Sequence, residues 1–299
     1  MKKLLTLALA AVLGVTTLAG CSSTGASAGA QTADTPSQTT DASAKADAPA
    51  DGGSASGGVI TVAASPTPHA IILEHVKDKL AEQGWELKIT EFEDYVQPNN
   101  VVESGEFTAN YFQHVPYLND FNAEHGTHLV SVKELHYEPF GIYPGVSNDL
   151  SNVKDGAEIA VPNDTTNEAR ALQLLEANGI IKLKEGVGLE ATVKDIEENP
   201  HNVKIVELEA AQVSRVINEA DFVVLNGNYA MEAGLSVGKD ALAAEASESE
   251  AAQTFANVLV VKEGNENDPG VQALISALAD DEVRSWIDSE FDGSVIPLF

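Results

Sequence analysis

The chain has 299 residues, a formal net charge of −29 and one cysteine, Cys21. So large an excess of acidic side chains is repelled by nucleic acid and by anionic lipid surfaces, and we expect neither as a partner. A single cysteine also excludes an intramolecular disulfide and a cysteine-based metal cage. The use that remains for Cys21 is acylation.

The first 20 residues have the pattern of a secretory signal peptide. Two lysines precede an apolar run from Leu4 to Val15, and Leu18-Ala19-Gly20 stands directly before Cys21. The run is shorter than the ~20 residues that a membrane-spanning helix needs. We therefore expect residues 1–20 to be cleaved and Cys21 to be lipidated, which places the protein on the cell membrane, lipid-anchored and facing the extracytoplasmic side. An ordinary cleaved signal without a lipid is the alternative.

Residues 21–58 are small and polar, and from Ser22 to Gly58 they contain no Leu, Ile, Val or aromatic residue. Such a segment buries too little apolar surface to offset its chain entropy, so we expect a disordered low-complexity tether. Loss of the signal removes two lysines and no acid, which changes the net charge from −29 to −31. Residues 59–299 remain, and they are enough for two lobes.

Short apolar strands alternate with helical patterns through residues 59–299, which favours an α/β fold with mostly parallel strands. We expect strands at 58–64, 85–92, 129–135, 157–161, 203–208, 222–225 and 257–261. We expect helices at 72–80, ended by Gly84, and at 115–125, 167–178, 210–217 and 270–287.

Four polar and aromatic segments stand where strands are expected to end and helices to begin, which is where α/β sheets usually hold ligands. They are 92–99, 110–117, 162–170 and 225–230. In the third, cap residues place Arg170 in the first turn of a helix, where its guanidinium and exposed backbone N–H groups favour a carboxylate. A plain surface arginine is the alternative.

Asn226 ends a buried apolar run, and its amide oxygen is suited to accept from a ligand ammonium. A turn residue is the alternative, although Asn228 is the better candidate for that role. Tyr95, Tyr111, Phe112 and His114 offer surface for an unbranched apolar side chain or a thioether. Taken singly, each of these four would more often be a core residue, so their clustering carries the prediction.

Catalytic and metal motifs are not found in the sequence. His125 and His128 have metal-ligand spacing, but no third ligand is nearby and Gly126 between them indicates a loop. There is no nucleophile elbow, phosphate loop or dinucleotide fingerprint. We therefore predict no enzyme, no cofactor and no metal, and instead two lobes that close on a small solute.

The residues that carry a family resemblance lie in these same segments. They include Phe92–Asn99, Ala109–His114, Gly141–Tyr143, Pro162–Asp164 with Asn167 and Arg170, Asp195–Pro200, and Asn226 with Tyr229 and Ala230. On these residues the chain, from about Thr61 to Phe299, closely resembles the methionine-binding lipoproteins of the NlpA type, the substrate-binding components of methionine ABC importers.

The resemblance implies a two-lobed periplasmic-binding-protein fold, type II-like, with mixed or parallel sheets flanked by helices. We place lobe 1 at residues 59–138 plus 246–299 and lobe 2 at 139–245. The implied partners are methionine or a close analogue and an ABC permease with a cytoplasmic ATPase. The membrane is contacted through the lipid anchor only, and we expect a monomer.

By position, the resemblance implies that Arg170 holds the ligand carboxylate and Asn226 its ammonium group. Tyr95, Phe112 and His114 would enclose the side chain. Further candidates are Asn167, Tyr111, His136 and Tyr143. The family's usual serine after Gly-Ile-Tyr is Pro144 here, which leaves the choice among L-methionine, D-methionine, the sulfoxide and methionine-containing dipeptides open.

Two other functions stay open at this point. One is a binding protein for another small solute, such as a different amino acid, a dipeptide or a metal. The other is a surface-interaction lipoprotein with a degenerate pocket.

Overall fold

The computed structural model describes residues 57–246 and 253–299, and these belong to one compact unit. The predicted signal peptide, Cys21 and all of the predicted tether before Gly57 lie outside the described residues. Within the part of the chain that is described, no helix combines the length and the apolar character needed to cross a bilayer.

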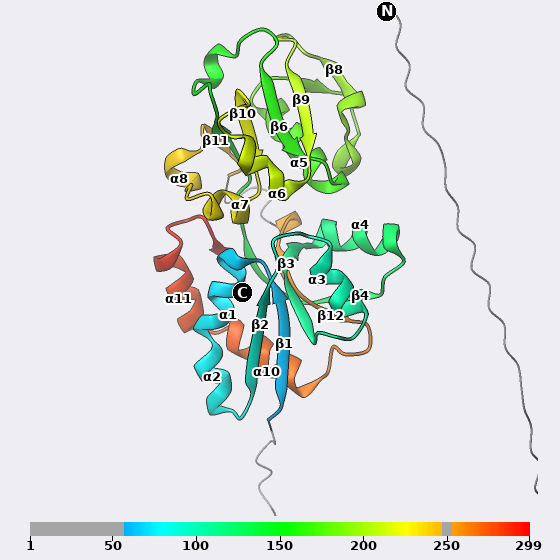
Figure 1. The fold of residues 1–299 in the computed structure, drawn as a ribbon, viewed down its shortest axis with the longest axis vertical. Coiled ribbons are helices and arrows are strands. Elements are labelled where there is room, and N and C mark those ends of the chain that lie inside the picture. Colours follow the sequence, from blue (N-terminus) through cyan, green and yellow to red (C-terminus); the bar gives the residue numbers. More distant parts are fainter. Residues whose placement is uncertain (1–56, 247–252) are drawn as a thin grey trace, which may run out of the picture. The chain divides into compact units, whose positions relative to one another are not determined.

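Two β-sheets organise the described chain (Figure 1). The first has the order β13-β4-β12-β3-β1-β2, with β1 Val59–Ala64, β2 Glu86–Glu91, β3 Ala109–His114, β4 Leu129–Tyr137, β12 Asn257–Lys262 and β13 Ile296–Pro297. The second has the order β11-β5-β10-β6-β9, with β5 Gly141–Pro144, β6 Glu158–Pro162, β9 Lys204–Leu208, β10 Phe222–Leu225 and β11 Ala243–Ala244. A small pair joins β7 Lys182–Leu183 to β8 Ile196–Glu198.

Helices flank both sheets. Those with the first sheet are α1 Ile71–His75, α2 Lys77–Glu82, α3 Gln97–Glu103, α4 Val115–His125, α10 Pro269–Leu278 and α11 Asp281–Glu290. Figure 1 shows α1, α2 and α11 on one side of that sheet and α3 and α4 on the other. Those with the second sheet are α5 Thr165–Ala177, α6 Ala210–Val213, α7 Gly227–Glu232 and α8 Val237–Asp240.

Both sheets mix strand directions, so the expectation of mostly parallel strands is wrong. In the first sheet β1 runs parallel to β2 and β3, but β12 runs antiparallel to β3 and β4. In the second, β6 is parallel to β9 and β10, while β5 is antiparallel to β10. The chain passes from one sheet to the other directly before β5 and again before β12, and both of these strands are antiparallel to the strands beside them.

The strands of the first sheet lie in residues 59–137 and 257–297, and those of the second in 141–244. Each sheet has its own buried cluster. Ile60, Val62, Leu259 and Leu274 belong to the first, and Phe140, Ile159, Leu172 and Phe222 to the second. The chain therefore has two lobes and crosses between them twice, while the exact lobe boundaries at residues 138 and 245 stay a prediction.

Capping residues explain where the helices begin and end. Helix α4 has the predicted bounds: the ring of His114 accepts from Tyr117 N at its start, and Gly126 takes a left-handed conformation at its end. The single helix predicted at 270–287 is wrong, because it is two helices. Asp280 stops the first and caps the second by accepting from Glu282 N at 2.9 Å.

Residues 110–114, predicted as a junction between strand and helix, form the fully buried strand β3. Its polar side chains are paired with one another and with α3. Asn99 exchanges two hydrogen bonds with Gln113, at 3.0 and 2.6 Å, and accepts from Asn110 at 2.9 Å. Buried amides paired in this way replace the apolar residues that usually reveal a central strand.

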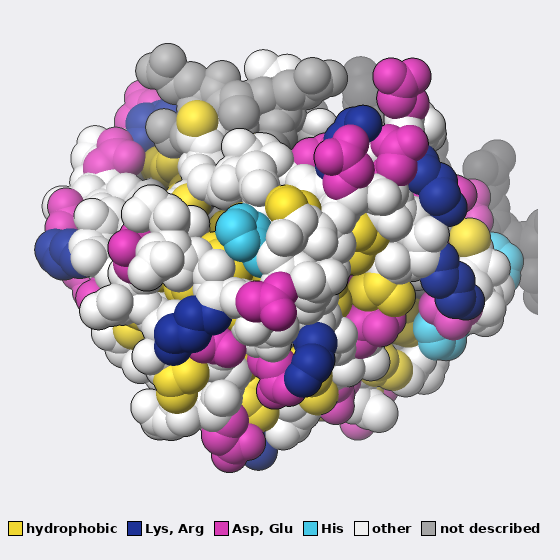
Figure 2. All heavy atoms as spheres, turned by 90° about the horizontal axis from the view of Figure 1, so that it is seen from above, with side chains coloured by type: hydrophobic (Ala, Val, Ile, Leu, Met, Phe, Trp, Pro, Cys, Tyr) yellow, Lys and Arg dark blue, Asp and Glu magenta, His cyan; other side chains and the backbone are white. Residues whose placement is uncertain are grey.

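The surface in Figure 2 is the end of the molecule seen from above, and it shows acidic side chains interspersed with Lys and Arg. Apolar side chains are scattered over this face and form no broad patch.

The close packing at Gly145 can be tested by a substitution in the second lobe. A Cβ there would lie 2.2 Å from Ala220 O and 2.9 Å from Asp221 O, both backbone atoms. We expect Gly145→Ala to lower the free energy of unfolding by about 1–3 kcal/mol, because β5 must move away from β10. In Gly238→Ala, the matched control, the new Cβ meets nothing within 4 Å. Urea unfolding curves measure both, and equal midpoints would contradict the close approach.

Candidate ligand-binding site

A pocket of about 330 Å³ lies where residues of the two lobes meet. From the first lobe it is lined by Tyr95, Phe112, Gln113, His114, Tyr117 and Asn257. From the second it is lined by Asn167, Arg170, Asn226, Gly227 and Asn228, and Glu138 enters from the crossover between β4 and β5.

Six of the nine residues predicted to bind the ligand line this one pocket. They are Tyr95, Phe112, His114, Asn167, Arg170 and Asn226. They come from several elements, and the two at the extremes, Tyr95 and Asn226, are 131 positions apart in the chain, so their meeting is a property of the fold. That they contact a ligand stays a prediction.

Arg170 is 4% exposed and fixed on most sides. Its Nε and Nη2 donate to the two oxygens of Glu245, at 2.8 and 2.6 Å, and Nη2 also donates to Glu138 O at 3.1 Å. The guanidinium carbon lies 4.1 Å from the ring centroid of Phe255 and 4.7 Å from that of Phe140. Burial alone would lower the pKa of Arg170, but the Glu245 carboxylate raises it above its usual value.

The start of α5 differs from the prediction. Arg170 is the sixth residue of the helix, in its second turn. The side chain of Asp164 accepts from Asn167 N at 3.1 Å and from Asn167 Nδ2 at 2.8 Å, so the helix caps itself. The predicted place of Arg170 in the first turn is therefore wrong, and one backbone N–H of this helix start is capped by Asp164; that the start of α5 and Arg170 hold an anion stays a prediction.

Asn226 stands at the N-cap of α7 but makes no side-chain cap hydrogen bond. Its Nδ2 donates to Asn167 Oδ1 at 2.9 Å, while its buried Oδ1 has no partner. The amide is thus held with a free acceptor in the pocket. Asn228, assigned above to a turn, lies within α7 and accepts from Tyr95 OH at 2.5 Å, so that assignment is wrong.

His114 joins the lobes as a neutral ring. Its Nε2 lies 3.0 Å from Asn167 Oδ1, an atom that only accepts, so Nε2 carries the hydrogen. Its Nδ1 accepts from Tyr117 N at 3.2 Å. Burial first, and then the charge of Arg170, lowers the pKa of His114 to about 3, so the ring is uncharged at neutral pH.

Aromatic rings form one wall of the pocket. The centroid of Tyr95 lies 5.8 Å from that of Phe112, 5.7 Å from that of Tyr117 and 5.1 Å from that of Tyr229. Tyr229 OH donates to Glu93 O at 2.8 Å, and this bond adds a link between the lobes. The wall is apolar in its ring faces and its hydroxyl groups are engaged, which suits an uncharged side chain.

Three predicted residues do not line the pocket. Tyr111 OH is hydrogen-bonded to His136 Nδ1, and both side chains are 0% exposed. Tyr143 on β5 is also 0% exposed and packs in the core with Val213 and Val223. His136 is bonded to Glu138, which lines the pocket, and a direct contact of any of the three with a ligand stays a prediction.

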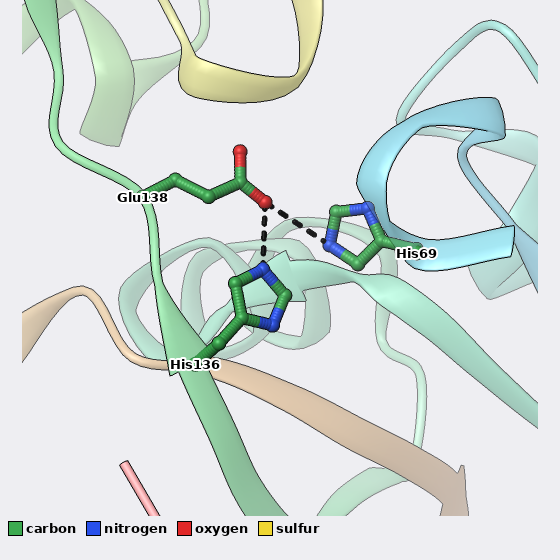
Figure 3. A group of neighbouring side chains, drawn as sticks. All are labelled: His69, His136 and Glu138. Atoms are coloured by element: carbon green, nitrogen blue, oxygen red, sulfur yellow. Dashed lines mark hydrogen bonds and ion pairs between the residues drawn. The ribbon is translucent and has the colours of Figure 1, made fainter. Parts of the chain in front are cut away.

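A cluster behind the pocket joins Glu138 to two histidines (Figure 3). Glu138 Oε1 lies 2.8 Å from His136 Nε2 and 3.4 Å from His69 Nε2. Burial raises the pKa of Glu138 and lowers those of His69 and His136 to about 4 and about 3. Among the described residues, these three side chains have ligand atoms close enough to share a metal ion.

The histidine pair considered for a metal in the sequence lies elsewhere. His125 stacks on Phe121 with ring centroids 4.1 Å apart, and His128 Nδ1 lies 3.5 Å from Glu103 Oε1. Neither belongs to the cluster at Glu138.

The sequence did not reveal two pocket residues, Glu138 and Asn257. Asn257 opens strand β12 and accepts from His69 Nε2 at 3.0 Å. Glu138 is a single carboxylate that directly follows the buried end of β4. One carboxylate among 46 acidic residues gives no local signal of such a role. Gln113 and Tyr117 stood inside a segment considered, but no role was assigned to them.

Solved structures of known proteins resemble the described fold. A putative lipoprotein from Ruminococcus gnavus is 64% identical, with a TM-score of 0.80, over 81% of this chain and 99% of that one. A nutrient-binding protein from Burkholderia cenocepacia, solved bound to methionine, is 40% identical with a TM-score of 0.76, over 80% of this chain and 100% of that one.

The sequence also has curated relatives. The D-methionine-binding lipoprotein MetQ of Salmonella typhimurium is 39% identical over 225 residues, which are 74% of this chain and 82% of that protein. The family model described as NlpA lipoprotein matches residues 60–299, nearly the whole of the described chain. This match, with the two-lobed fold, shows that the chain belongs to the NlpA lipoprotein family.

Proposed function

We propose that this protein is a lipid-anchored, extracytoplasmic substrate-binding protein that captures methionine and delivers it to an ABC importer. The observation that carries the proposal is the pocket between the lobes. It combines a fixed guanidinium, an amide oxygen without a partner and a wall of aromatic rings. These are receptors for a carboxylate, an ammonium group and an apolar side chain, the three parts of methionine.

The carboxylate of the ligand would bind Arg170. The hydrogen bonds to Glu245 and Glu138 use Nε and Nη2, so Nη1 is the side of the guanidinium offered to a ligand. A charge-assisted hydrogen bond of this kind contributes about 1.5–3 kcal/mol when water is excluded. The Glu245 pair keeps the guanidinium in place before the ligand arrives, which reduces the entropy lost on binding.

The ammonium group would donate to Asn226 Oδ1. Because Nδ2 of the same amide is bonded to Asn167, the oxygen cannot turn away. A buried acceptor without a partner costs free energy, and a ligand donor removes that cost. Selectivity for an amino acid over a plain thioether follows from this pair of contacts.

The thioether side chain would lie against Tyr95 and Phe112. Burial of such a side chain contributes about 1.5–3 kcal/mol, and sulfur packs favourably near aromatic rings. The methionine bound to the Burkholderia protein supports this choice of ligand. Binding requires no covalent step, so we propose that the protein is not an enzyme.

The attachment and the transport partner belong to the same proposal. Acylation of Cys21 would hold the protein at the membrane through lipid alone. The closed, methionine-loaded form, as a monomer, would dock on a permease with a cytoplasmic ATPase. The relatives that are named as lipoproteins support the anchor.

Thermal unfolding against a panel of amino acids tests the ligand. Methionine at 100 times its dissociation constant should add about 2.7 kcal/mol of stability, while leucine and glutamine should add little. The ligand binds the folded state only, so the midpoint should rise with its concentration. A protein stabilised by another solute but not by methionine would contradict the ligand, and a protein stabilised by no small solute would favour a surface-interaction role.

Arg170→Lys tests the carboxylate receptor. Lysine can still pair with Glu245 but lacks the second arm of the guanidinium, so we expect methionine affinity to fall at least about 10-fold. Calorimetric titration measures it. Arg170→Ala is less informative, because it leaves the Glu245 charge buried and costs about 3–5 kcal/mol of stability. Arg284→Lys, at a position outside the pocket, is the control; unchanged affinity in Arg170→Lys would remove Arg170 from the site.

A further inference from the structure

The carboxylate of Glu138 has no role in the function proposed above. It is 6% exposed and lines the pocket together with Arg170 and Asn226. A buried carboxylate in a ligand pocket is expensive to retain without a partner of opposite charge. Its presence therefore calls for a ligand group that compensates it.

The position of Glu138 is fixed by several contacts. Figure 3 shows one oxygen facing His69 and His136 and the other turned away from both rings. The backbone N–H of Asn228 donates to the carboxyl group. A Cβ on Gly227 would lie 2.8 Å from Oε2, so only glycine lets the start of α7 come so close. Four acceptor positions on a carboxylate leave room for a further donor from the ligand.

The charges around the pocket leave Glu138 uncompensated. Arg170 is already paired through two hydrogen bonds with Glu245. His69 and His136 face Glu138 but are neutral rings, since burial keeps the pKa of each well below its usual value. One guanidinium therefore stands against two carboxyl groups. Burial raises the pKa of Glu138, and a cation beside it would stabilise its charged form.

We propose that Glu138 is the counter-charge for the α-ammonium group of the bound amino acid, with Oδ1 of Asn226 as the second acceptor. The inference rests on the proposed function and deepens it. It makes the site selective for a free α-amino group, against the desamino and N-acylated forms of the same side chain. A peptide with methionine at any position after the first would be excluded by the same contacts.

A metal ion is the other cation that the cluster suggests, and the hydrogen bonds oppose it. His69 Nε2 lies 3.0 Å from Asn257 Oδ1, which only accepts, so this nitrogen carries a hydrogen and has no lone pair for a metal. His136 is bonded to Tyr111 through Nδ1 and to the carboxylate through Nε2. With the Tyr111 hydroxyl donating, Nε2 of His136 also carries its hydrogen. His136 thus donates to Glu138, while the Nε2 hydrogen of His69 is directed to Asn257 and only lies near the carboxyl group.

The first test uses the wild-type mature chain and three probes: L-methionine, 4-(methylthio)butanoate, which lacks only the amino group, and N-acetylmethionine. Calorimetric titration should show both analogues binding at least about 10- to 150-fold more weakly than methionine, the range of a charge-assisted hydrogen bond. Equal affinity for methionine and 4-(methylthio)butanoate would overturn the inference without any variant. A chain that binds no methionine would overturn the proposed function as well.

The second test is Glu138→Gln, which keeps the shape of the side chain and an acceptor for Nε2 of His136. We expect its methionine affinity to fall about 10- to 150-fold and its affinity for 4-(methylthio)butanoate to stay nearly unchanged. Glu158→Gln, at a half-exposed surface ion pair, is the matched charge control and should leave both affinities unchanged. A parallel loss for both ligands would assign Glu138 a structural role only. Methionine binding that is lost on chelation and restored by zinc would replace the ammonium subsite with a metal site.

Discussion

The site depends on the buried pair of Arg170 and Glu245. Removing two such charges from water costs several kcal/mol for each, and a pair of this kind persists only when its geometry is good and its other polar atoms are bonded. The geometry is good, since two parallel hydrogen bonds join the groups, Tyr137 OH and Phe140 N also donate to Glu245, and two aromatic rings cover the guanidinium; Nη1 of Arg170 is left for the ligand. The receptor for a carboxylate is therefore preformed, and the ligand does not have to order it.

The pair also determines what the neighbouring groups must be. The charge of Arg170 adds to the effect of burial on His114, so that ring is held neutral and serves as a hydrogen-bond bridge between the lobes. With the imidazoles uncharged, the carboxyl group of Glu138 is bonded to a neutral ring and to a backbone N–H. A zwitterionic ligand complements this arrangement at both ends, whereas an anion complements only one.

Local sequence rules predicted the elements whose ends are marked by caps. Helix α4 was found at its predicted bounds, because Pro116 and Gly126 mark its ends, but the pattern at 270–287 hid Asp280, which both interrupts and caps. Strand β3 was not predicted, because its buried positions hold amide side chains that are paired with α3, where apolar residues would have indicated a strand. The direction of the strands was also predicted wrongly, because no local sequence pattern indicates that the chain returns into the first sheet at β12.

The site shows the same division between local and long-range information. Arg170 and Asn226 were identified from their place after buried strands, and six of nine candidates line the pocket. Glu138 was not identified, because one carboxylate among 46 acidic residues carries no local mark. Its surroundings are set by residues distant in the sequence. His69, 69 positions earlier in the chain, lies beside the carboxyl group, and the lack of a side chain at Gly227 leaves space for Glu138 in the pocket. A residue whose role is defined by charges brought together from both lobes is visible only once the fold has assembled them.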